Sequence, residues 1–186
     1  MRKGVSMNPF KAFIETIPKT HRETTCWSFH DGQIWKYDIP LNIHEFDNIF
    51  KVVARYFREW QLFADLEAQV LVVSNLDYEN YYTHFPVLPC DSEHYKIIIL
   101  PQINTSTNTI IDDSYWYKTV KGQPIMRIHS HHKWAAYQSE TDFTTLNSGT
   151  LEVVLGNIDQ DVITIAYWLT RYSDESVKSH TFSTTL

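Results

Sequence analysis

The sequence predicts an α+β fold, α/β-like in its order of elements, in which helices pack on a β-sheet. Residues 45–64 have the apolar periodicity of an amphipathic helix. The run VLVVS at 70–74 follows, with the length and β-branched composition of a strand buried on both faces. Two apolar runs at 151–156 and 161–172 flank a short turn and predict a hairpin. This order of helix and strands indicates one domain.

The N-terminal part is predicted to contain an extension, residues 1–30, that is polar and irregular, followed by the domain itself at 31–186. Residues 32–41 alternate enough to predict a strand that Pro40 closes. In the helix at 45–64, apolar residues recur every three or four positions, which predicts one buried face. This face consists of Phe46, Ile49, Phe50, Val53, Phe57 and Trp60.

The middle of the chain predicts further strands at 95–100 and 124–131. A strand at 81–88 is expected at an edge or end of the sheet, because Pro86 cannot donate a ladder hydrogen bond. The polar stretch 101–123 is long for a connection and is either a functional loop or a passive surface loop.

A second helix is predicted at 139–148, after the strand at 124–131. Ser139, with Asp142 three residues later, makes a start that resembles a capping box. Gly149 is a typical helix stop.

Composition narrows the classes of function. A net charge of −6 without a basic run argues against binding to a nucleic-acid backbone. No apolar stretch approaches the roughly 18 residues of a membrane span, and the N-terminus has no apolar run typical of a secretory signal. Cys26 and Cys90 have no metal-type spacing and are expected to be reduced thiols. We therefore expect a cytoplasmic protein.

Three histidines in four positions end the strand predicted at 124–131. On a strand, His129 and His131 face the same side, whereas His132 faces the other side unless the strand has already ended. Two imidazoles on one side can bind the same zinc ion, and Asp142 in the first turn of the next helix is a plausible third ligand. The alternative is that the histidines are surface residues and Ser139 only caps a helix.

Three other architectures with a His-x-His motif do not fit. The metallo-β-lactamase motif needs Asp where this chain has Lys133. A barrel amidohydrolase has its motif near the N-terminus of a much longer chain. A cupin has a Glu a few residues after the second His and flanking glycines, but Glu140 is too distant and the glycines are missing.

The remaining pattern resembles the signature of the JAMM metalloproteases, the catalytic branch of the MPN-domain superfamily. His129-Ser130-His131 is followed after seven residues by Ser139-Glu140-Thr141-Asp142. The family also has a Glu upstream, near the start of an apolar strand. Glu67, which lies 62 residues before His129, matches it. The order of elements resembles that of the family over about residues 31–172.

The resemblance implies a mixed, curved sheet flanked by the helices at 45–64 and 139–148. It also implies one Zn²⁺ held by His129, His131 and Asp142, a general base at Glu67, and an oxyanion-stabilising hydroxyl at Ser139. The expected activity is hydrolysis of an amide or isopeptide bond, with the extended C-terminal tail of a ubiquitin-like or sulfur-carrier-like protein as substrate. Family members often carry a substrate-gripping insertion in the position of 101–123.

The chain departs from the family pattern at three places. His132 stands where Pro is usual, Ile128 where an aromatic or small residue is frequent, and Ser74-Asn75 where a Gly is common. None of these positions is an expected ligand. Two other classes stay open: a non-catalytic MPN-type scaffold or binding module, and a different small metal-dependent amide hydrolase.

Overall fold

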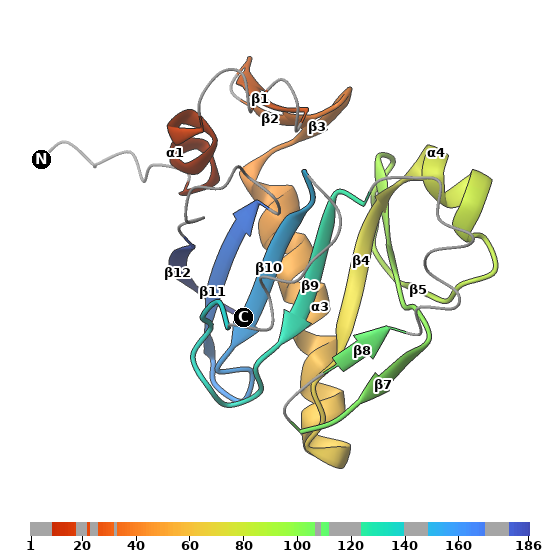
Figure 1. Cartoon of the computed structure of the whole chain (residues 1–186), viewed down its shortest axis with the longest axis vertical. Helices are drawn as coiled ribbons and strands as arrows, with labels where there is room; N and C mark the ends of the chain where they lie inside the picture. The colour runs from red at the N-terminus through yellow and green to blue at the C-terminus, as the bar shows by residue number, and fades with distance from the viewer. Residues whose placement is uncertain are drawn as a thin grey trace, which may run out of the picture.

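The computed structural model describes residues 9–17, 22, 26–31, 33–106, 109–111, 124–139, 149–169 and 179–186. They form an α+β structure around a seven-stranded sheet of order β12-β11-β10-β9-β4-β6-β5 (Figure 1), so the predicted fold class is confirmed. Neighbouring strands are antiparallel except β9 and β10, which are parallel, so the sheet is mixed. The strands are β4 (Gln69–Ser74), β5 (Val87–Leu88), β6 (Tyr95–Ile98), β9 (Met126–Ser130), β10 (Leu151–Gly156), β11 (Val162–Leu169) and β12 (His180–Thr185).

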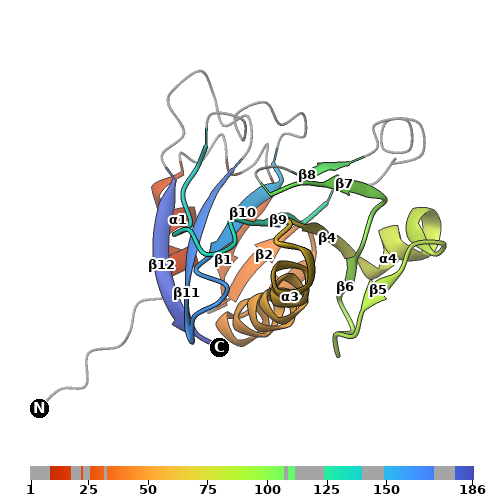
Figure 2. The same ribbon diagram turned by 90° about the horizontal axis from the view of Figure 1, so that it is seen from below.

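The long predicted helix is present as α3 (Ile43–Ala64) and lies along one face of the sheet, which curves around it (Figure 2). Its start is fixed by a capping box: Asn42 Oδ1 accepts hydrogen bonds from the backbone N–H groups of His44 and Glu45, at 3.0 and 3.1 Å. Glu45 Oε2 accepts the Asn42 N–H at 2.8 Å in return. The helix ends at Asp65, which has a left-handed φ of 50°.

The two faces of the sheet have different cores. The face under α3 forms one large cluster, to which β4, β9, β10 and β11 contribute alternate residues such as Val72, Ile128 and Val153. On the opposite face, Leu71 and Val73 pack beside Tyr82, and Val154 packs with Trp168 in a separate small cluster. This second face also carries the polar residues of the candidate site.

The N-terminal segment differs from the prediction. Residues 1–30 were expected to be polar and irregular, but α1 (Pro9–Thr16) is a helix and its side chains lie in the large core cluster. The ring of Phe10 stacks on Phe46 of α3, with centroids 4.3 Å apart. The expectation is wrong here because Phe10, Phe13 and Ile14 follow the spacing of a short amphipathic helix.

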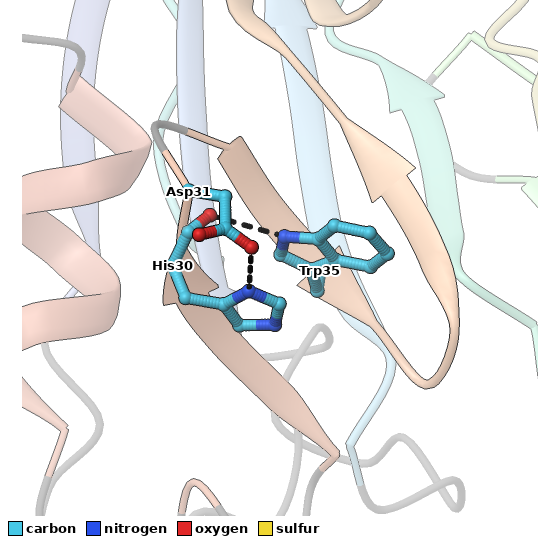
Figure 3. Close-up of polar contacts among 3 residues, drawn as sticks. All are labelled: His30, Asp31 and Trp35. Atoms are coloured by element: carbon cyan, nitrogen blue, oxygen red, sulfur yellow. Dashed lines mark hydrogen bonds and ion pairs between the residues drawn. The ribbon is translucent and has the colours of Figure 1, made fainter.

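The single strand predicted at 32–41 is instead two strands, β2 (Gln33–Lys36) and β3 (Ile39–Leu41). The chain turns at Tyr37, where φ is 54°. With β1 (Trp27–His30) these strands form a three-stranded antiparallel sheet. Figure 3 shows the end of the β1–β2 hairpin: Trp35 Nε1 donates to the carbonyl of His30 at 3.1 Å and Asp31 Oδ2 lies 3.1 Å from His30 Nδ1.

Other elements depart from the prediction more locally. The strand expected at 81–88 is replaced by a helical segment, α4 (Asn75–Asp77) and η1 (Tyr78–Tyr82), and only β5 remains extended. Within the stretch 101–123, the structure shows the hairpin β7 (Gln102–Asn104) and β8 (Thr109–Ile111). The helix predicted at 139–148 lies outside the described residues except for Ser139, and it stays a prediction.

Lys36 belongs to the N-terminal three-stranded sheet and contacts Gly149. Gly149 follows the part of the chain that contains the predicted metal ligand Asp142. Its side chain is fully buried, and Nζ donates to the carbonyl oxygen of Gly149 at 2.6 Å. Trp27 Nε1 donates to the same oxygen at 2.9 Å. Burial lowers the pKa of the Lys36 ammonium to about 8, an effect that Cys26 partly opposes.

Lys36 makes the stability of the protein depend on pH. Its folded pKa of about 8 lies below the ordinary 10.5, so the unfolded chain binds the proton more tightly between these values. The free energy of unfolding of the wild type should therefore rise by roughly 2 kcal/mol, relative to Lys36→Met, from about pH 7.5 to about pH 9.5. Urea unfolding of both proteins at the two pH values measures this difference. Parallel pH dependence in the two proteins would contradict the assignment.

Both cysteines are free thiols, as expected. No helix in the part of the chain that the structure describes is both long and apolar enough to cross a membrane.

Candidate metal centre

The pairing of β4 with β9 runs toward Glu67 on one strand and toward His129 and His131 on the other. The antiparallel register pairs Gln69 with His129. The next pair is joined by a hydrogen bond from the Ser130 N–H to the Ala68 carbonyl, at 3.0 Å. Continued by one more residue, the register places Glu67 opposite His131. Residues opposite each other in this way have Cβ atoms about 5 Å apart.

His129 and His131 lie on one face of the sheet, as predicted. The rings of His129 and His131 have centroids 5.2 Å apart and an interplanar angle of 59°. His129, His131 and Glu67 are 7%, 7% and 8% exposed, so all three polar groups are buried at the end of the strands. Such burial of ionisable side chains is costly unless they are paired or bind an ion.

The chain turns immediately after His131. β9 ends at Ser130, and His132 has a left-handed φ of 50°. Proline, with its φ fixed near −65°, cannot adopt this conformation, so a proline would not fit at this position. His132 is buried, and desolvation lowers its pKa while Asp65 opposes the effect.

The loop after the histidines is held against the turn between β10 and β11. The Asn157 and Ile158 N–H groups donate to the carbonyls of Trp134 and His132, at 2.7 and 2.8 Å. Thr164 Oγ1 accepts the Ala136 N–H at 2.7 Å. This bonding fixes the path of the chain from His131 toward Ser139.

A glycine in β10 is required for this close approach. A Cβ on Gly156 would lie 2.3 Å from both the Trp134 carbonyl oxygen and the Ala136 nitrogen. Both are backbone atoms, which cannot rotate away as a flexible side chain can. Sequence reasoning did not identify Gly156, Asn157 or Thr164, because the contact joins segments whose separation in the chain carries no local signal.

The structure describes Ser139 but not Asp142. Tyr137 lies edge-on to the ring of His131, with centroids 4.7 Å apart. Ser139 follows two residues later and is half-buried. Asp142 lies outside the residues that the structure describes.

An ion pair lies on the same face of the sheet. Arg127 precedes His129 by two residues, and its Nε lies 2.7 Å from Oε2 of Glu152, which is 1% exposed. The parallel register of β9 and β10 places these two residues side by side. This pair compensates the charge of a buried carboxylate next to the candidate site.

Of the proposed metal ligands, the structure describes the two imidazoles of His129 and His131. Among the residues that the structure describes, no three His, Cys, Asp or Glu side chains form a group that could hold a metal ion. The separation of the two rings is compatible with two ligands of one zinc ion as well as with ordinary ring packing. A zinc–nitrogen bond of about 2.0–2.1 Å puts each ring centroid roughly 3.2 Å from the metal, and tetrahedral geometry then separates two centroids by roughly 5.2 Å. The observed separation of His129 and His131 is 5.2 Å.

No protein-family model matches the chain, and no curated protein matches it either.

Proposed function

We propose that the protein is a zinc-dependent isopeptidase or peptidase of the JAMM type, in which His129, His131 and Asp142 hold the metal. The observation that supports this most is the 5.2 Å separation of the buried His129 and His131 rings, which suits two ligands of one tetrahedral ion. The register that places Glu67 opposite His131 supports the same reading. The MPN-type fold is part of this proposal.

In the proposed reaction, the chain's own residues position the groups and move the proton. Zinc, when bound, supplies a Lewis acid that polarises a carbonyl and lowers the pKa of water to about 7. Glu67 accepts a proton from the attacking water and delivers it to the leaving amine. Ser139 donates a hydrogen bond to the oxygen that becomes negative as the carbonyl is attacked. The burial of Glu67 and the histidines limits competition from bulk water.

The proposed substrate is a protein or peptide with an extended C-terminal tail, ubiquitin-like or sulfur-carrier-like. The β7–β8 hairpin lies beside the start of β4 (Figure 1). The Thr105 carbonyl in this hairpin accepts the Glu67 N–H at 2.8 Å, so the hairpin borders the site directly. A short hairpin can bind an extended chain by adding it as a strand.

Asp142→Ala tests the proposed ligand set. We expect this variant to lose its zinc while its unfolding temperature without metal stays near that of the wild type without metal. It should also not cleave a fluorogenic amide on the C-terminus of ubiquitin or of a sulfur-carrier protein, which the wild type should cleave. Elemental analysis and the fluorogenic assay measure the two effects, with Asp159→Ala as the matched control. A zinc-loaded Asp142→Ala protein would show that another residue is the third ligand.

A further inference from the structure

We propose that Gln102 is a positioning residue that holds the backbone around Glu67 in place opposite His131. The inference rests on the proposed function, because it assigns Gln102 a role in placing the general base of that reaction. Gln102 lies at the start of β7, 35 residues after Glu67 in the chain. Neither the sequence pattern nor the family signature identified it.

The side-chain amide of Gln102 binds both backbone groups of Gln69. Its Oε1 accepts the Gln69 N–H at 2.8 Å, and its Nε2 donates to the Gln69 carbonyl at 2.9 Å. Nε2 also donates to the carbonyl of Leu100 at 3.1 Å. The amide therefore makes the pair of hydrogen bonds that a neighbouring strand would make.

The side chain of Gln102 takes the place of a neighbouring strand where the ladder between β4 and β6 has ended. The last pair in the ladder between β4 and β6 is Leu71 with Ile98. Further along, the chain reaches Pro101, which has no N–H to donate. Gln102 supplies a hydrogen-bond partner to both backbone groups of Gln69, a residue that is 5% exposed. A buried backbone group without a partner is strongly unfavourable.

The backbone N–H groups of three successive residues are thereby all bonded. The Glu67 N–H donates to the Thr105 carbonyl at 2.8 Å, and the Ala68 N–H donates to Ser130 Oγ at 2.9 Å. Gln102 binds the third, that of Gln69. Since β7 supplies Gln102 and leads directly to Thr105, the same short segment holds the chain on both sides of Ala68.

The three hydrogen bonds at position 102 need a carboxamide, which accepts one of them and donates two. Gln102→Glu keeps an acceptor for the Gln69 N–H but loses both donated hydrogen bonds. Gln102→Ala loses all three. Because a displacement of about 1 Å in a catalytic group can cost on the order of 100-fold in rate, a shift of Glu67 should appear in kcat rather than in metal binding.

The test compares Gln102→Ala and Gln102→Glu with the wild type and with Gln160→Ala, an exposed glutamine in the β10–β11 turn. Two readouts are needed. Amide hydrogen exchange, followed by NMR, reports on the Gln69 N–H without reference to activity. Steady-state kinetics on the fluorogenic ubiquitin amide separates kcat from KM, and elemental analysis gives zinc content.

We expect the Gln69 N–H to exchange at least about 10-fold faster in Gln102→Ala, with Ile128 and Val72 amides in the sheet centre unchanged. We expect kcat to fall about 10- to 100-fold, KM to stay within about twofold, and zinc content to stay at the wild-type level. Gln102→Glu should behave similarly, and Gln160→Ala should match the wild type.

Unchanged exchange at Gln69 would overturn the anchoring by Gln102. Faster exchange with a wild-type kcat would overturn its role in placing Glu67. An equal loss of zinc and of stability in both variants would reassign Gln102 to general folding. If the wild type binds zinc but cleaves no amide, the proposed function fails, and the exchange result still decides whether Gln102 holds this backbone.

Discussion

Glu67→Gln is expected to slow the proposed hydrolysis by orders of magnitude while leaving the zinc content and the fold unchanged. The two side chains have nearly the same shape, so the buried position next to β4 should accept the substitution. A carboxamide cannot accept the proton of the attacking water, and loss of a general base typically lowers the rate about 10²- to 10⁴-fold. We expect a loss in this range in kcat on the fluorogenic amide, with KM nearly constant.

Glu59→Gln is the matched control for this prediction. Glu59 is an exposed residue of α3 and is another glutamate upstream of the histidines. Its substitution should leave kcat at the wild-type value. A fully active Glu67→Gln enzyme would exclude Glu67 as the base, and loss of zinc in this variant would show that Glu67 is a ligand instead.

Gly156→Ala is expected to displace the loop that follows the histidines. The added Cβ would lie 2.3 Å from backbone atoms of Trp134 and Ala136, so the loop must move away from β10. Overpacking of this kind typically destabilises a protein by about 1–3 kcal/mol. Because the loop leads from His131 to Ser139, we also expect weaker zinc binding and a lower kcat than in the wild type.

Urea unfolding and zinc titration measure these effects, with Val162→Ala as the control. Val162 is an exposed residue at the start of the neighbouring strand β11. It should change neither the stability by more than about 0.5 kcal/mol nor the zinc affinity. If Gly156→Ala binds zinc as tightly as the wild type, the docking of the loop does not shape the metal site.

The sequence predicted the elements whose patterns are long and regular. The helix α3 and the strand β4 are confirmed. A sustained apolar periodicity and an unbroken apolar run are strong local signals of secondary structure. α1 was missed because its apolar face is only two turns long and is stabilised by packing on α3. The strand predicted at 81–88 is helical at its start, where Tyr81 and Tyr82 end η1, and the prediction is wrong there because tyrosines favour strands in isolation.

The candidate site also contains some features that the sequence predicts and others that it does not. The shared side of His129 and His131 could be predicted because alternate positions of a strand face the same side. The β4–β9 register, whose continuation would place Glu67 opposite His131, depends on the pairing of two distant strands and is visible only in the fold. Gln102 and Gly156 act on backbone atoms far away in the sequence, so no local pattern marks them.

The central claim is that the histidines form a metal centre, and metal content tests it most directly. The measurement is elemental analysis of wild-type protein and of His129→Ala, both purified without chelators and without a nickel column. The account predicts about one zinc per chain in the wild type and none in the variant. A wild-type protein that contains no zinc and takes up none when it is supplied would contradict the account.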